Sequence, residues 1–120
     1  MMADWNSYRQ QLVETIGKIA QLSPDTVRGY SVLGAASSKT KHLDAKIREL
    51  IALAVAVTLR YDGCITVHTD AAIKQGASQE EIAEALGVAV SVNAGAALVY
   101  SARAMDAYGA NEQGAAVVRK

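Results

Sequence analysis

The chain is short, electrically neutral and rich in small apolar residues. It has 120 residues, 51% of them hydrophobic and 20% charged, and its twelve basic residues balance twelve acidic ones. Neutrality excludes the electrostatic footprint of a protein that binds nucleic acid or an acidic membrane surface. Because one cysteine cannot form an intrachain disulfide and the N-terminus lacks a signal peptide, we expect one cytoplasmic domain over residues 1–120.

The N-terminal third predicts two helices separated by a cap. Leu12, Ile16 and Ile19 recur at helical spacing within a first helix from about residue 4 to 21. Ser23 followed by Pro24 is typical of an N-cap with proline in the first helical position, so a second helix is expected over residues 24–36. The polar residues 37–41 predict a loop.

The middle of the chain predicts a central antiparallel helix pair. Asp44 is placed to cap a third helix that runs to about Arg60 and is apolar around most of its circumference, so we expect it to be buried. Its apolar run, Leu50 to Val57, is too short to span a bilayer. Asp62 is placed to cap a fourth helix, which Gly76 is placed to end.

The C-terminal third predicts two more helices. Ser78 and Glu81 have the spacing of a capping box and begin a fifth helix. Residues 93–95 (Asn-Ala-Gly) predict a break, after which a sixth helix should run to Tyr108. The tail, residues 110–120, is expected to be ordered only in part. The fold class is therefore all-α with about six helices. Since alanine and valine bury little area, we also expect the chain to bury a further face in a homo-oligomer.

Cys64 and His68, the only cysteine and one of two histidines, lie one helical turn apart and should share a helix face. Cys64 would occupy the first turn of the fourth helix, where free backbone N–H groups favour a thiolate. A thiolate beside an imidazole is a candidate nucleophile. The alternative is that Cys64 fills space as a small buried hydrophobe and that His68 is a satisfied core residue.

Glu49 is the third candidate, because it is a carboxylate among apolar neighbours on the third helix. It lies some three turns before the break, so simple hairpin geometry does not bring it to Cys64. Contact requires a steep helix crossing or another subunit. Glu49 could instead pair with a nearby cation such as Lys46, Arg48 or Arg60. His42 is expected to be solvated surface, and one Cys and one His are too few ligands for a metal site.

These residues resemble the carboxymuconolactone decarboxylase superfamily, and its alkylhydroperoxidase AhpD-like branch most closely. The resemblance covers about residues 43–108 and rests on Lys46 to Ile51, on Cys64-x-x-x-His68, and on residues 76–82. It implies an AhpD-like helical bundle that assembles into trimers or hexamers. In redox members of the family a glutamate precedes a Cys-x-x-Cys-x-x-x-His motif, which places Glu49, Cys64 and His68 on the glutamate, the second cysteine and the histidine.

The resemblance implies a function in which the second cysteine attacks a peroxide while the glutamate and histidine relay protons through water. The first cysteine of the motif falls on Tyr61, which cannot form a disulfide, so a sulfenic acid on Cys64 would need an external thiol for its reduction. Tyr61 would line the site or act as a core aromatic. Decarboxylation of a small carboxylated lactone by His68 and Glu49 is a second reading, and a non-catalytic oligomer that binds a small ligand is a third. None of these readings requires a cofactor.

Overall fold

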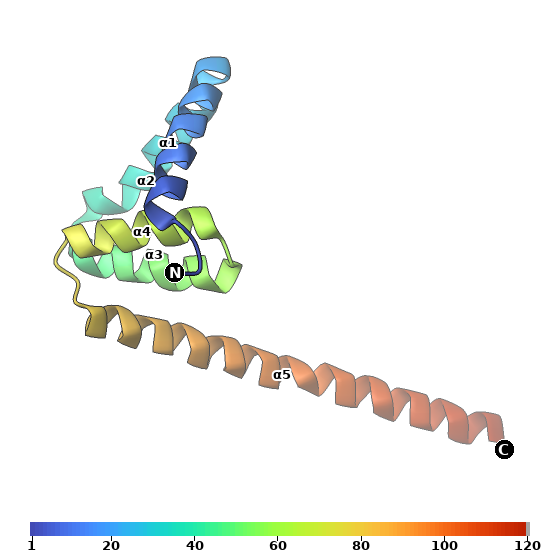
Figure 1. Ribbon diagram of the computed structural model, residues 1–120. Helices are drawn as coiled ribbons and strands as arrows, with labels where there is room; N and C mark the ends of the chain where they lie inside the picture. Colours follow the sequence, from blue (N-terminus) through green and yellow to red (C-terminus); the bar gives the residue numbers. More distant parts are fainter. Residues whose placement is uncertain (120) are drawn as a thin grey trace.

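The computed structural model describes the backbone of residues 1–119 and the side chains of residues 1–114, and most of this part of the chain is helical (Figure 1). It contains five helices and no strand, which confirms the predicted all-α class. The helices are α1 (Trp5–Leu22), α2 (Pro24–Thr40), α3 (Ala45–Leu59), α4 (Asp62–Lys74) and α5 (Gln79–Arg119).

The first two helices occur as predicted and pack together as a hairpin, in which α2 is longer than expected. Asp4 caps α1 by accepting a hydrogen bond from a first-turn amide at 3.1 Å, and Pro24 is the first residue of α2. The predicted loop over residues 37–41 is wrong for residues 37–40, which belong to α2, and Lys41 is the residue that follows the helix. The hydroxyls of Ser38 and Thr40 donate to carbonyls one turn earlier, at 2.7 and 3.0 Å, which satisfies them inside the helix.

The next two helices form the predicted antiparallel pair, which makes the most extensive helix–helix contact in the described chain. Asp44 caps α3, as predicted, by accepting the Ile47 amide at 2.9 Å. The predicted cap of α4 is wrong by one residue: Tyr61 occupies the cap position with extended backbone and Asp62 is the first helical residue. Gly76, at φ 86°, follows the end of α4 as predicted.

The last helix is continuous where two helices were expected. The capping box is confirmed, since the Glu81 carboxylate accepts the Ser78 amide at 2.9 Å and the Ser78 hydroxyl accepts the Glu81 amide at 3.0 Å. The predicted break at residues 93–95 is wrong. The side-chain amide of Asn93 donates to the Ala89 carbonyl at 2.7 Å, so it supports the helix. The helix also passes the predicted stop after Tyr108 and continues through the expected tail to Arg119.

Two polar contacts tie the first half of α5 to α3. The Lys46 ammonium and the Glu81 carboxylate are 2.7 Å apart, and the Asn93 amide donates to the Thr58 hydroxyl at 3.0 Å. Both pairs are 35 residues apart in the sequence, so α3 and α5 run parallel. α3 therefore lies between α4 and α5, as expected of the central helix.

The salt bridge at the start of α5 makes stability depend on pH. The hydrogen bond from Lys46, followed by that from the Ser78 amide, lowers the pKa of Glu81 from its ordinary 4.5 to about 2. A carboxyl whose pKa is lower in the folded state stabilises the protein above pH 4.5 and loses that contribution as the pH falls toward 2. We expect Glu81→Gln to flatten the dependence of the melting temperature on pH across this window. Glu80→Gln, at an exposed neighbouring carboxylate, is the control, and parallel curves for Glu81→Gln and wild type would contradict the assignment.

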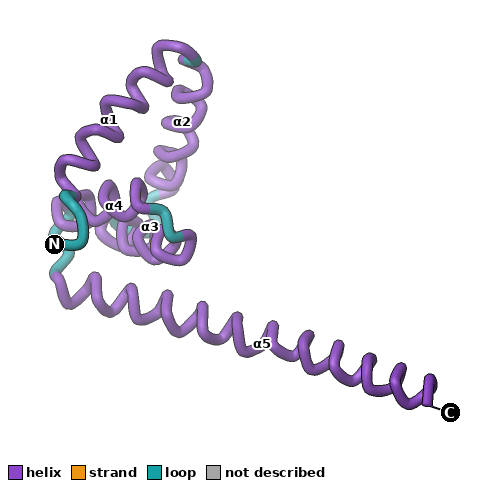
Figure 2. The backbone as a smooth tube through the Cα atoms, turned by 45° about the vertical axis from the view of Figure 1, so that its right-hand side comes forward, coloured by secondary structure: helices purple, strands orange, loops and turns teal. Residues whose placement is uncertain are grey.

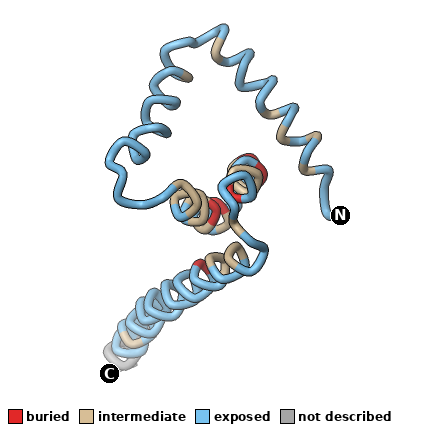
Figure 3. The backbone as a smooth tube through the Cα atoms, turned by 90° about the vertical axis from the view of Figure 1, so that its left-hand side faces the viewer, coloured by how far each residue is buried: buried red, intermediate tan, exposed pale blue. Residues whose placement is uncertain are grey.

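The core is small and lies at the contact of the three central helices (Figure 3). Its buried residues are Leu53, Ala56, Gly63, Thr66, Ala72 and Ala89. The expectation that α3 is buried around most of its circumference is wrong for the single chain, because Ile51, Val55 and Leu59 are at least half exposed. Alanine and glycine let the helices approach closely but bury little area, so half of α3 stays uncovered.

The chain is elongated. Its radius of gyration is 21.2 Å and its extents are 67 × 39 × 37 Å, whereas a compact domain of this length has a radius of about 14 Å. The α1–α2 hairpin projects to one side of the central pair and α5 to another (Figure 2). By length and composition alone, α5 over Gln79–Gly114 is also apolar enough to cross a membrane, and little of this stretch is buried.

Candidate active site

The structure brings two of the predicted site residues into direct contact. Glu49 on α3 and His68 on α4 meet across the central pair, with 2.7 Å between Oε2 and Nδ1. Their side chains are 26% and 28% exposed, so the pair is shielded but reachable. Of the cations that could have paired with Glu49, Lys46 binds Glu81 and Arg48 donates to the Leu43 carbonyl.

The contact defines which ring nitrogen faces the rest of the site. With Nδ1 held by the Glu49 carboxylate, Nε2 is the nitrogen left to accept or donate a proton. A carboxylate in this position fixes the orientation of the imidazole and stabilises the positive charge that develops when Nε2 accepts a proton. Glu49 and His68 therefore form an oriented acid–base unit within one chain.

Cys64 lies beside this unit on α4. Cys64 is half-buried and is the third residue of α4, so it lies in the first turn of this helix, as predicted. Backbone N–H groups in this turn have no helical partner and favour an anion. Cys64 and His68 are one turn apart and so share a face of α4. Among the described residues the thiol makes no hydrogen bond, either to His68 or to Glu49.

Tyr61 folds over the start of α4. Its side chain is 51% exposed, and its ring atoms would lie 3.3 Å from a Cβ added to Gly63. Leu12 of α1 would be 3.0 Å from the same Cβ. Gly63 thus lets an aromatic ring and α1 approach the first turn of α4, which is the turn that holds Cys64.

The first helix fixes the opposite face of α4. The Thr66 hydroxyl donates to the Trp5 carbonyl at 3.2 Å, and Arg9 and Asp70 form an ion pair at 3.7 Å. The pKa of Asp70 is lowered, first by a hydrogen bond from Lys74 and then by the charge of Arg9. These contacts hold α4 from one side while α3 holds it from the other, so the position of the Cys64–His68 face is determined by two helices.

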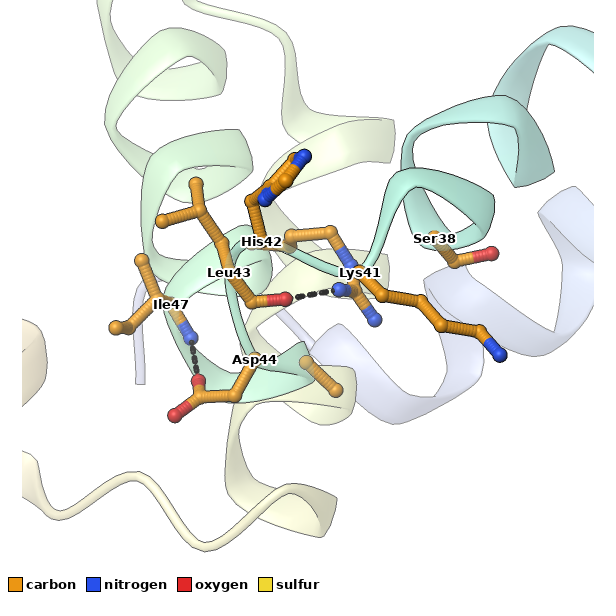
Figure 4. Close-up of a pocket in the computed structure, with 8 residues that line it drawn as sticks. Ser38, Lys41, His42, Leu43, Asp44 and Ile47 are labelled. Atoms are coloured by element: carbon orange, nitrogen blue, oxygen red, sulfur yellow. Dashed lines mark hydrogen bonds between the residues drawn. The ribbon is translucent and has the colours of Figure 1, made fainter.

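A separate depression lies at the junction of α2 and α3 (Figure 4). Its volume is about 520 Å³ and its lining includes Ser38, Lys41, His42 and Arg48, but none of the three site residues. His42 is exposed there, which confirms that it is surface. In the part of the chain with described side chains, no group of three or more His, Cys, Asp or Glu side chains is placed to hold a metal ion.

The fold and the site define a class: an all-helical protein whose central helix pair carries a cysteine beside a glutamate–histidine pair. Residues 24–107 match the carboxymuconolactone decarboxylase family. The protein belongs to this family, as the resemblance implied.

The chain is similar to two sequence relatives and to one solved structure. A protein from Haemophilus influenzae, described as uncharacterized, is 45% identical over 90% of this chain and 96% of its own length. Another, from Cupriavidus necator, is 27% identical over 88% of this chain and 93% of its own length. The crystal structure of a carboxymuconolactone decarboxylase family protein from Legionella pneumophila, in its apo form, is similar with a TM-score of 0.71 and 34% identity, covering 88% of this chain and 94% of that one.

Proposed function

We propose that the protein is a thiol-dependent peroxidase of the AhpD-like branch, which reduces hydroperoxides through Cys64. The observation that carries this proposal is the Glu49–His68 hydrogen bond of 2.7 Å, one helical turn from a half-buried thiol in the first turn of α4. A nucleophile is activated when a neighbouring base can take its proton and a third group, here a carboxylate, orients that base.

The oxidative step follows from these positions. The Cys64 thiolate attacks the terminal oxygen of a hydroperoxide, so a sulfur–oxygen bond forms as the oxygen–oxygen bond breaks. His68 holds the thiol proton on Nε2 and delivers it to the departing alkoxide, which leaves as an alcohol. Glu49 holds the ring through Nδ1 during both transfers. Cys64 is left as a sulfenic acid.

The reductive step uses an external thiol, because Tyr61 stands where the family's redox members have the first cysteine of their motif. A first thiol displaces water from the sulfenic acid and forms a mixed disulfide with Cys64. A second thiol attacks this disulfide, releases an external disulfide and restores the Cys64 thiol. The half-exposed Tyr61 side chain lies against Gly63 in the turn that holds Cys64, and we propose that it lines the path of both substrates.

A second candidate function is decarboxylation or proton abstraction on a small carboxylated lactone. One specific observation favours it: the Glu49–His68 unit is complete without the thiol, which has no hydrogen bond among the described residues. In this reaction His68 would transfer the proton, Glu49 would orient His68, and Cys64 would only fill space. The two candidates differ in whether the sulfur changes its oxidation state.

Direct trapping of the sulfur tests the peroxidase. Without added thiol, the wild-type protein should consume about one equivalent of cumene hydroperoxide per chain and stop. Dimedone, which reacts with sulfenic acids, should then label Cys64, as mass spectrometry of its peptide would show. Dithiothreitol should restore continuous turnover. An unlabelled Cys64 with peroxide left intact would remove the basis for this function.

The same proposal includes partners and a location. The elongated chain, with its exposed apolar helices, supports a homo-oligomer, for which the family suggests a trimer or hexamer. The other partners are a small-molecule hydroperoxide and an external thiol, and the cycle uses no bound cofactor. A reducing cytoplasm would supply the thiol and keep a lone cysteine reduced.

A further inference from the structure

Among the described residues, the half of α5 beyond Asn93 packs against no other helix. The first half is held on α3 by Glu81 and Asn93, but α3 ends at Leu59, one residue past the partner of Asn93. Residues 94–114, here called distal α5, therefore project alone (Figure 1). Their large apolar side chains are 65% to 75% exposed: Leu98, Val99, Tyr100, Met105 and Tyr108. An isolated helix with this surface is marginal in water unless another element covers it.

The α1–α2 hairpin is the second uncovered surface. Neither helix contains a buried residue, and the only substantial contact of α2 is with α1. Figure 3 shows the hairpin as an open, exposed arch beside the central pair. Its apolar side chains recur at helical spacing and are 40% to 74% exposed: Val13, Ile16, Ile19, Tyr30 and Leu33. A helical hairpin with this pattern is expected to bury its apolar side.

The chain exposes more area than a compact monomer of its mass. The chain exposes 9546 Å², whereas a compact monomer of 12.6 kDa exposes about 6,200 Å². The excess is about 3,300 Å² per chain. Obligate homo-oligomer interfaces bury about 2,000–5,000 Å² in total, or about 1,000–2,500 Å² on each partner. Two such surfaces on each chain, distal α5 and the hairpin, are therefore large enough to account for this excess.

We propose that distal α5 of one copy docks on the apolar side of the α1–α2 hairpin of a second copy. The lengths fit, because the 21 residues of distal α5 span about 31 Å and the 18 residues of α1 about 27 Å. Their net charges are opposite. The hairpin carries four cations and two anions (Arg9, Lys18, Arg28, Lys39, Glu14, Asp25), and distal α5 one cation and two anions (Arg103, Asp106, Glu112).

The same observations argue against other partners that could cover distal α5. Contact between two copies of distal α5 would join surfaces of the same net charge and leave both hairpins uncovered. Insertion of α5 into a lipid bilayer would conflict with its polar ties to α3, since Glu81 and Asn93 bind Lys46 and Thr58 within the apolar stretch. Docking on the hairpin of a second copy covers distal α5, and it also covers the apolar side of that hairpin. This inference does not depend on the reaction at Cys64.

Photo-crosslinking tests the contact in the full chain. Tyr100, 69% exposed on distal α5, is replaced by p-benzoylphenylalanine, and the protein is assembled from a mixture of ¹⁴N and ¹⁵N chains so that crosslinks between copies are identified by mass. We expect crosslinks between copies to peptides within residues 5–40. The same group at Gln75, an exposed position at the end of α4, is the control and should give few. Crosslinks to α5 of the second copy, or none between copies, would overturn the proposal.

Charge insertion on each side gives an independent measurement. Val99→Glu on distal α5 and Ile16→Glu on the hairpin should each weaken assembly at least about tenfold in sedimentation velocity, because each buries an unpaired carboxylate. If Val99→Glu dissociates the assembly while Ile16→Glu leaves it intact, α5 docks elsewhere and the proposal fails. A monomeric wild-type chain, or co-sedimentation with phosphatidylcholine–phosphatidylglycerol vesicles through α5, also contradicts it. If either variant does not fold, the crosslinking result decides.

Discussion

Replacing Cys64 with serine is expected to lower hydroperoxide turnover at least about a thousandfold, to the level of the buffer. A serine hydroxyl is not ionised near neutral pH and is not oxidised by peroxides, so neither the attack nor the sulfenic acid can form. The measurement is the initial rate of cumene hydroperoxide consumption with dithiothreitol as the reductant. Since Cys64 is the only cysteine, alkylation of the wild-type protein with iodoacetamide should give the same loss.

The control for this variant is Ile73→Ser on the same helix. Ile73 is 60% exposed and lies nine residues beyond Cys64, so it should tolerate serine and retain full turnover. Full hydroperoxide turnover by Cys64→Ser would eliminate the peroxidase. If Cys64→Ser also decarboxylates a carboxylated lactone at the wild-type rate while His68→Ala does not, the acid–base reaction is the function of this site.

Those parts of the fold that depend on contacts within one helical turn could be predicted from the sequence. The Asp44 cap, the Ser78–Glu81 capping box and the left-handed Gly76 each arise from residues that lie next to one another in the chain. The central antiparallel pair followed from an apolar tract, a break and a second helix. Local chemistry decides such features, so tertiary packing does not need to be known.

The errors occurred where a weak local signal was opposed by another contact. Gly95 costs a helix only about 1 kcal/mol, and the Asn93 amide bonds to the Ala89 carbonyl and to Thr58 instead of interrupting the helix. In α2, Ser38 and Thr40 satisfy their hydroxyls inside the helix, so a polar segment stayed helical. Sequence patterns show that a residue can break a helix, but the partners that prevent the break are found only in the folded chain.

The candidate site, like the fold, could be predicted from the sequence only in part. The placement of Cys64 and His68 on one face of α4 followed from their spacing. The Glu49–His68 hydrogen bond did not, because it depends on how far α3 and α4 are staggered across their two-residue link. Hairpin geometry predicted no contact between Glu49 and Cys64, and the structure places Glu49 against His68, one turn further along α4. The signal that could have found the pair was the histidine one turn beyond the cysteine, within reach of a long carboxylate side chain.

Substitutions in the Glu49–His68 pair are expected to give the second large loss of hydroperoxide turnover. His68→Ala is expected to lower kcat/KM for hydroperoxide by about 10²–10⁴, because it removes the group that takes and returns the proton. Glu49→Gln should lower it by a similar factor, up to about 10⁴. Glutamine keeps the size of the side chain but can donate to Nδ1, which places the ring proton on Nε2 and prevents this nitrogen from accepting the thiol proton.

A double-mutant cycle separates this positioning role from a general loss of stability. Because Glu49 acts through His68, the variant with both substitutions should be no less active than His68→Ala alone. Added imidazole should partly restore His68→Ala but leave Glu49→Gln unchanged, since the ring is still present there. The exposed carboxylate Glu80, changed to glutamine, is the matched control and should have no effect on kcat/KM. Additive losses from the two substitutions would show that Glu49 and His68 contribute separately, and the acid–base unit described here would then be wrong.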